Sequence, residues 1–92
     1  NDFETLKTII NYGINLNIKD KRGYTPLMHM VEEGLKIKDK KEKEVFIERL
    51  IYFLKYRVNI DTQDNDGRTV MHKAVIANDL LVVEKLLTKK QI

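Results

Sequence analysis

The side chains that could carry out chemistry are few, and their spacing does not assemble a catalytic centre. The chain has two histidines, His29 and His72, and no cysteine. A zinc site needs several Cys or His ligands at short spacing, which this pattern lacks. The sequence also contains no Gly-rich phosphate loop and no Ser, His and Asp at a spacing that supports catalysis. We therefore expect no enzymatic activity, no metal and no cofactor.

Residues 64–67, Asp-Asn-Asp-Gly, are superficially similar to a calcium-binding loop. In that frame the first ligand falls on Thr62 and the bidentate acid falls on Lys73. Neither residue supplies the carboxylate oxygens that Ca²⁺ requires at these positions. The segment is therefore interpreted as a turn.

Residues 36–44 alternate between lysines and acids, with five Lys against three Asp or Glu. Mixed charges at helical spacing are typical of a solvated helix surface. Contact with an acidic partner or with nucleic-acid phosphates is the alternative. The whole chain has 17 basic and 14 acidic residues, which is a mixed surface rather than the strong single-sign field of a nucleic-acid binder.

Length and composition set further limits. Ninety-two residues give room for one small domain. No apolar run approaches the roughly 18–20 residues that span a bilayer, so no membrane contact is expected. The absence of cysteine favours an intracellular location, cytoplasmic or nuclear. The bias towards Ile, Lys and Asn is typical of AT-rich coding DNA, so that location is a host cell if the source is a virus or an intracellular microbe.

The elements that position these side chains follow from an internal repeat. Residues 20–25 match residues 64–69 at an offset of 44, and residues 1–3 match residues 78–80 at an offset of 77. These offsets fit a period of 33 residues with one insertion of about 11 residues. We place the insertion between Gly34 and Val45, as an elongated link between two helices.

Residues 20–27 follow the pattern Asp-x-x-Gly-x-Thr-Pro-Leu, and residues 64–74 keep its Asp, Gly and Thr together with His72 and Ala74. These motifs resemble the ankyrin-repeat family, and the resemblance covers the chain from end to end. It implies an all-α solenoid of helix-turn-helix units joined by short β-turn fingers, in one domain of about two and a half repeats. We assign residues 1–19 to a partial repeat, 20–63 to the repeat with the insertion and 64–92 to the last repeat.

Local signals agree with this register. Thr25 and Thr69 suit helix N-caps, and Pro26 suits the first helical position. Gly23 and Gly67 are expected to supply the positive φ of the tight turns. Gly34 and Asn78 suit the left-handed residue that closes each first helix. The first helices are expected at 26–33 and 70–77, and the second helices at 3–11, 40–56 and 80–89.

The helix at 40–56 is the longest of these. Asp39 followed by Glu42 has the spacing of a capping box, so we expect the helix to begin at Lys40 and to project past the stack on the side opposite the fingers. A disordered loop with helix beginning near Phe46 is the alternative.

The sequence departs from the family pattern at several positions. Met28 replaces the motif histidine of the middle repeat, which puts the usual hydrogen bond of that histidine in doubt there. The resemblance implies that His72 is a structural hydrogen-bonding residue, whereas His29 falls one position later and is expected at the surface. Arg57 and Lys90 stand where the family has Gly, so a left-handed cap there is strained by roughly 1 kcal/mol.

The function that the resemblance implies is protein binding through the concave face and the fingertips. Tyr24, among cationic neighbours, is either an exposed binding anchor or a ring that lies back on the neighbouring repeat. Carried over position by position, the binding face comprises Lys19, Lys21, Arg22, Tyr24, His29, Glu32, Glu33, Gln63, Asn65, Asp66, Arg68, Lys73, Ile76 and Ala77.

Two other functions remain open at this point. The segment could be a structural spacer of repeats within a larger enzyme, channel or effector, in an array that continues into further repeats. Nucleic-acid binding is less favoured, because Glu32, Glu33 and Asp66 place acids on the expected face. The identity of a partner protein does not follow from a repeat fold.

Overall fold

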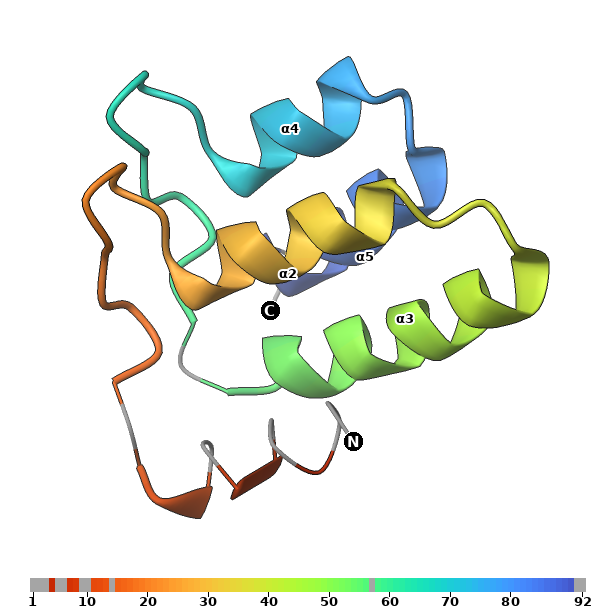
Figure 1. Ribbon diagram of the computed structural model, residues 1–92, viewed down its shortest axis with the longest axis horizontal. Coiled ribbons are helices and arrows are strands. Elements are labelled where there is room, and N and C mark those ends of the chain that lie inside the picture. Colours follow the sequence, from red (N-terminus) through yellow and green to blue (C-terminus); the bar gives the residue numbers. More distant parts are fainter. Residues whose placement is uncertain (1–3, 5–6, 9–10, 14, 57, 91–92) are drawn as a thin grey trace.

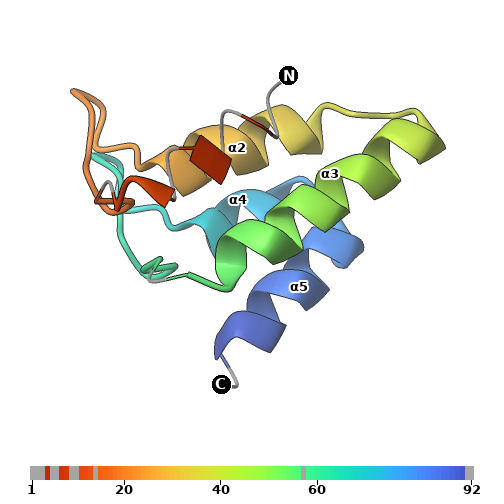
Figure 2. The ribbon, with the colours of Figure 1, turned by 90° about the horizontal axis from the view of Figure 1, so that it is seen from below.

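The computed structural model describes residues 4, 7–8, 11–13, 15–56 and 58–90. The helices it defines are α2 (Pro26–Leu35), α3 (Lys40–Leu54), α4 (Val70–Ile76) and α5 (Leu80–Lys90). Each pair, α2–α3 and α4–α5, packs together, and the two pairs stack with α2 on α4 and α3 on α5. Figures 1 and 2 show this stack from two sides, with the turns before α2 and α4 at the same end. The all-α repeat architecture expected from the sequence is confirmed.

The first helix of each pair begins as the sequence predicts. The Thr25 hydroxyl accepts from the backbone N–H of Met28, and the Thr69 hydroxyl accepts from that of His72. Pro26 takes the first position of α2, where its missing N–H costs nothing. Each cap satisfies a donor that the helix itself leaves unpaired.

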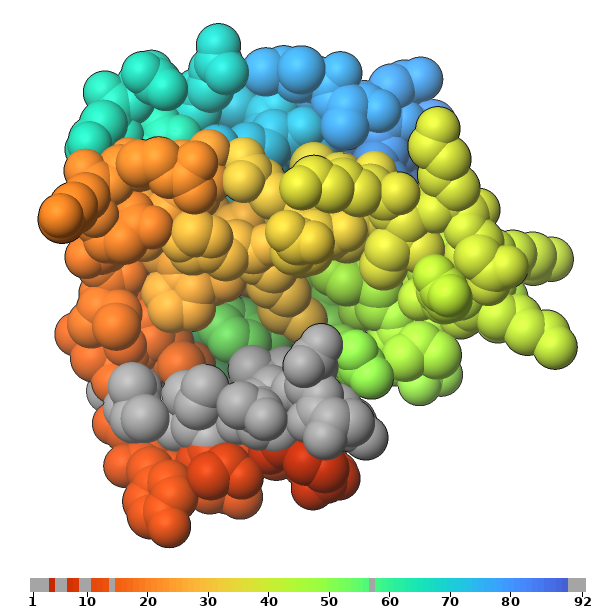
Figure 3. Space-filling view, in the orientation of Figure 1, coloured from red at the N-terminus to blue at the C-terminus, as the bar shows by residue number. Residues whose placement is uncertain are grey.

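The expected insertion lengthens helix α3 more than it lengthens the link between α2 and α3. Asp39 caps α3 by accepting from the backbone N–H of Glu42, and the helix runs for 15 residues against 11 in α5. The expected start at Lys40 is confirmed and the disordered alternative is wrong, although the helix ends at Leu54 rather than near residue 56. Only residues 36–39 separate α2 from α3, so the elongated link is not found. The start of α3 projects at the end opposite the turns (Figures 1 and 3).

The turn glycines and Asn78 have the backbone conformation that the sequence predicts, whereas Gly34 does not. Asn78 has a φ of 56° and closes α4 as expected, and Gly23 and Gly67 have φ of 78° and 76° at the turns. Gly34 does not have a positive φ but lies inside α2, where a Cβ would overlap the ring of Phe46. The expectation of a left-handed Gly34 is therefore wrong: glycine is needed there for close packing.

The expectations for Lys90, for Arg57 and for the first helix of the chain have different outcomes. Lys90 is the last residue of α5, so the expected left-handed cap at this position is wrong. Arg57 lies outside the described residues. Most of the expected helix at 3–11 also lies outside them, although residues 4, 7, 8 and 11 are helical and the Tyr12 N–H donates to the Thr8 carbonyl.

The core lies between the helix pairs. Its largest fully buried side chains come from all four helices and include Leu27, Met28, Leu50, Phe53 and Leu86. Short helices such as α4 are marginal alone, so burial of these side chains supplies most of their stability. Burial of each contributes roughly 1.5–3 kcal/mol.

The outer face of the last pair exposes apolar side chains. Val75, Leu80 and Leu87 are 58%, 73% and 46% exposed. The residues at the same positions of the preceding pair are buried: Val31, Ile47 and Leu54. Since α4 and α5 pack against that preceding pair, the last pair exposes the kind of surface that a stacked pair covers.

Candidate functional site

Two turns of identical construction form the fingers, which we define as residues 19–25 (first finger) and 63–69 (second finger). In the first, the Asp20 N–H donates to the Tyr24 carbonyl, and Asp20 Oδ1 accepts from the N–H groups of Arg22 and Tyr24. In the second, Asp64 makes the same three bonds with the groups 44 residues later. Each aspartate therefore folds its own turn around its carboxylate.

The other carboxylate oxygen of each aspartate pairs with a residue nine positions later on the following helix. Asp20 Oδ2 lies 2.7 Å from Nε2 of His29, and Asp64 Oδ2 lies 3.0 Å from Nζ of Lys73. The finger and the helix of each repeat are thus tied by one equivalent polar contact, to a histidine in one repeat and to a lysine in the other.

These contacts shift the pKa of both aspartates downwards. The backbone N–H of Tyr24 and the ring of His29 lower the pKa of Asp20, and burial opposes them. The N–H of Arg68 and the ammonium of Lys73 lower the pKa of Asp64 to about 2. Burial alone lowers the pKa of Lys73, but its hydrogen bonds to Asp64 and Tyr24 outweigh that effect and raise it. All three groups are therefore held in their charged forms near neutral pH.

Asn65 joins the two fingers to one another. Its backbone N–H donates to the Arg22 carbonyl at 2.9 Å, and its side-chain amide donates to the Lys21 carbonyl at 2.8 Å. A Cβ on Gly23 would come within 2.7 Å of the Asn65 side chain, so the close approach of the fingers requires glycine there.

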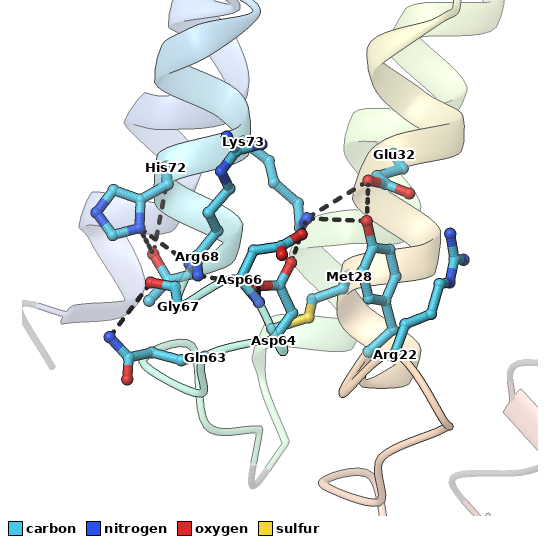
Figure 4. A network of polar contacts seen from close by, with 12 residues as sticks. Arg22, Met28, Glu32, Gln63, Asp64, Asp66, Gly67, Arg68, His72 and Lys73 are labelled. Carbon is cyan, nitrogen blue, oxygen red and sulfur yellow. Dashed lines mark hydrogen bonds and ion pairs between the residues drawn. The ribbon is translucent and has the colours of Figure 1, made fainter.

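A polar network crosses between α2 and α4, where the fingers join these helices (Figure 4). The Tyr24 hydroxyl donates to Glu32 at 2.8 Å and accepts from Nζ of Lys73 at 3.1 Å. Nζ of Lys73 also lies 3.4 Å from the Glu32 carboxylate. Tyr24 therefore lies back on the neighbouring repeat, and the alternative of a free, exposed aromatic anchor is wrong.

Cations also contact the ring of Tyr24. The Arg22 guanidinium lies 4.2 Å from its centroid, and Nζ of Lys73 lies 4.3 Å from it. Such contacts contribute roughly 0.5–2 kcal/mol each, more when the cation is desolvated. The side chain of Lys73 is only 8% exposed, so its ammonium is used inside the network and not presented at the surface.

A groove of about 390 Å³ opens between α2, α4 and the second finger. It brings together six of the residues expected from the sequence: Tyr24, Glu32, Asp66, Arg68, Lys73 and Ile76. Three residues that the sequence interpretation missed complete its wall: Leu35, Lys36 and Asp64. The equivalence of Asp20 and Asp64 in the repeat is the sequence signal that could have indicated Asp64.

The other expected site residues do not line this groove. All of them are exposed: Lys19, Lys21, Arg22, His29, Glu33, Gln63, Asn65 and Ala77. Gln63 donates to the Gly67 carbonyl, and Glu33 pairs with Lys36. Within the expected set, Tyr24, Glu32 and Lys73 are half-buried and the other residues are exposed.

His72 and Met28 occupy equivalent positions with different consequences. Nδ1 of His72 accepts from the Thr69 N–H at 3.0 Å, which completes a reciprocal capping box and confirms its structural role. Met28 has no such acceptor and is buried in the core instead. His29 is exposed as expected, although its pairing with Asp20 was not foreseen.

A second cross-repeat contact was also missed by the sequence interpretation. Nζ of Lys43, in the first turn of α3, pairs with the Asp79 carboxylate in the link before α5 and donates to the Gly34 carbonyl. Pairs of this separation leave no local pattern in a sequence.

Within the described part of the chain, no three His, Cys, Asp or Glu side chains are grouped so as to hold a metal ion. Over those same residues, no helix has the length and apolarity needed to cross a membrane.

Comparison with known proteins complements this geometry. The family model for ankyrin repeats in three copies matches residues 1–92. The chain is 34% identical over 92 residues to a putative ankyrin repeat protein of Rickettsia bellii (strain RML369-C), an alignment that covers 98% of this chain. The chain spans 45% of the length of that relative.

Proposed function

The chain belongs to the ankyrin-repeat family, and from this premise we propose that it binds a partner protein through the fingers and the groove between α2 and α4. Ankyrin repeats are generally protein-interaction modules and are generally non-enzymatic. The observation that carries the proposal is the groove, where exposed Arg68, Asp66 and Ile76 surround a rigid polar floor. Ile76 is 70% exposed and gives the rim of the groove an apolar side chain.

The proposed surface combines features that favour specific binding. The floor of the groove is held by Asp64, Lys73 and Glu32, so it needs little rearrangement on association. Its rim offers one guanidinium, one carboxylate and one apolar side chain. An arginine and an apolar residue next to a preformed floor are typical of residues that dominate interface energies.

The test is the affinity of a purified partner, first isolated by affinity capture and then identified by mass spectrometry. Arg68→Ala and Ile76→Ala should each weaken binding about 10-fold or more, as interface residues of these types do. Lys55→Ala and Leu81→Ala remove an equivalent cation and an equivalent apolar side chain elsewhere on the surface and should leave the affinity unchanged. Equal effects of both sets would refute this face as the binding site.

A structural role within a longer repeat array is the second proposal, and the exposed Val75, Leu80 and Leu87 favour it. We propose that a further ankyrin-type helix pair covers this face, because the corresponding residues of the preceding pair, Val31, Ile47 and Leu54, are buried within the chain. Fusing one more repeat after residue 92 should raise the unfolding midpoint. Concentration-dependent dimers of the unextended chain that Leu80→Glu abolishes would instead show that a second copy covers the face.

An intracellular location is part of this proposal, since a small domain without cysteine does not depend on an oxidising compartment. Fractionation of source cells and their host with a specific antibody tests it. Recovery from the extracellular medium alone would refute it.

A further inference from the structure

We propose that the tip of the first finger is an anion-docking surface that takes an acidic segment of the partner protein. Its residues are Lys19, Lys21 and Arg22, with Arg22 as the fixed centre. The inference rests on the proposed function, because it names the chemistry of the partner where it meets the first finger.

The positive charge of this tip is only partly offset by its own finger. Asp20 is the acid within residues 19–25, and its two oxygens are occupied by the N–H groups of Arg22 and Tyr24 and by His29. All three cations are exposed, and none forms an ion pair with an acid of the described residues. Three cations are therefore available to a ligand on one short turn.

Arg22 is held in place before any ligand arrives. Its guanidinium stacks 4.2 Å from the centroid of Tyr24, and the Tyr24 hydroxyl is fixed between Glu32 and Lys73. A planar guanidinium that is stacked on one face keeps its N–H donors free at the edge for a carboxylate. An immobilised arginine also loses less side-chain entropy on binding than a mobile one.

The backbone that carries these cations is fixed as well. Asn65 of the second finger donates to the carbonyls of Lys21 and Arg22, and Gly23 turns the chain with a φ of 78°. The side chains of Lys21 and Arg22 therefore start from a rigid base. This distinguishes them from lysines spread over a helix surface.

The second finger is different at the equivalent positions. Where the first finger has Lys19, Lys21 and Arg22, the second has uncharged or acidic residues: Gln63, Asn65 and Asp66. Figure 4 places Arg22 beside α2 and Asp66 on the α4 side of the network. The charge thus changes sign across the two tips, so an acidic segment is attracted to the first finger and repelled by Asp66. This difference gives the bound segment a position and a direction.

A protein segment fits this surface better than a nucleic acid does. Nucleic-acid backbones need cations along an extended path. The three cations of this tip lie within four consecutive residues of one turn, and exposed or half-buried acids follow on α2 and on the second finger: Glu32, Glu33 and Asp66. A protein segment can place a short run of Asp or Glu against the cationic tip and uncharged residues against the neighbouring acids.

The experiment uses a fluorescein-labelled peptide of six glutamates flanked by Gly and Ser, with the binding followed by fluorescence anisotropy and by ¹H–¹⁵N spectra. The largest amide shifts should lie in residues 19–24 and at Asn65. Replacing Lys19, Lys21 and Arg22 together by Gln should weaken binding about 10-fold or more, and Arg22→Lys alone about 3-fold, since the charge stays but the planar fork is lost. Replacing Lys38, Lys40 and Lys41 together by Gln removes the same charge from another exposed cluster and should have little effect.

The outcomes separate this inference from the broader proposal. Equal weakening by both triple variants means general charge attraction and overturns the inference, as does displacement of the peptide by a DNA duplex that binds more tightly at the same residues. A partner that depends on Arg68 and Ile76 but not on the first-finger cations leaves the proposed function intact and overturns the inference alone. Thermal melts of each variant verify that these exposed substitutions leave the fold intact.

Discussion

The carboxylate of Asp64 lies 3.0 Å from the ammonium of Lys73, so the second finger is ion-paired to the helix that follows it. The Arg68 N–H and this ammonium lower the pKa of Asp64 from 3.8 to about 2. A carboxylate with a depressed pKa in the folded state stabilises the fold above its unfolded pKa and loses that contribution as pH falls through the folded value. The free energy of unfolding should therefore decrease as the pH falls from about 4 to about 2.

Urea titrations at a series of pH values measure this dependence. Asp64→Asn should make it shallower over that window, because one of the two aspartates with a lowered pKa is gone and only Asp20 remains. Asp66→Asn removes the same charge two residues later without breaking the Lys73 pair, and should retain the slope. An unchanged slope in Asp64→Asn would assign the acid sensitivity to other groups.

Gly34 and Gly67 should respond differently to alanine. A Cβ at Gly34 meets the ring of Phe46, so Gly34→Ala should cost about 1–3 kcal/mol of the unfolding free energy through overpacking. A Cβ at Gly67 meets nothing within 4 Å, and Gly67→Ala should cost only roughly 1 kcal/mol for its φ of 76°. Chemical denaturation measures both. Phe46→Leu should reduce the cost of Gly34→Ala if the ring is the obstacle, and purely additive effects would contradict that cause.

The sequence predicts local features of this fold well. The caps at Thr25, Thr69 and Asp39 involve residues three positions apart, so their patterns are visible in the sequence itself. The turn glycines, and Asn78 after α4, follow from the same local rules. The position of the insertion stays a prediction, and the residues assigned to it largely extend α3, because Lys- and Glu-rich segments favour helix when a cap starts it.

The features that the sequence did not predict depend on distant contacts. Tyr24 bonds to Lys73, 49 residues away, and Lys43 to Asp79, 36 residues away. Gly34 looked like a left-handed cap, because its packing against Phe46 exists only when α2 and α3 are assembled. The expected binding face itself stays a prediction, although six of its residues line one groove. Which residues of the expected face join the polar network, and which are exposed, depends on how the two repeats pack together and could not be predicted from the sequence.

Lys43 should hold the projecting start of α3 against the last repeat. Its ammonium contacts both Asp79 and the Gly34 carbonyl, so Lys43→Met should cost about 1 kcal/mol of the unfolding free energy. The amides of residues 41–44 should also exchange faster with solvent in this variant. Lys41→Met, two residues earlier and exposed, is the matched control and should change neither. Equal exchange rates in the two variants would mean that the contact does not restrain the helix.

Ile47 and Leu80 occupy the same position of successive second helices but should tolerate charge differently. Ile47 is 7% exposed, so Ile47→Lys buries an ammonium and should cost roughly 3 kcal/mol or more. Leu80 is 73% exposed, so Leu80→Lys should change the unfolding free energy by less than about 0.5 kcal/mol. Urea unfolding of the isolated chain measures both. A large loss in Leu80→Lys would show that this face is already covered in solution.

The two hydrogen bonds from Asn65 to the carbonyls of Lys21 and Arg22 fix the distance between the fingers before any encounter with a partner. A partner that matches this spacing can associate as a rigid body, at a rate limited by diffusion and orientation. A partner that needs a wider spacing must first break both bonds, and its association rate then includes that opening step. On the proposed function, selection among partners would therefore be kinetic as well as energetic, and Asn65 would control it.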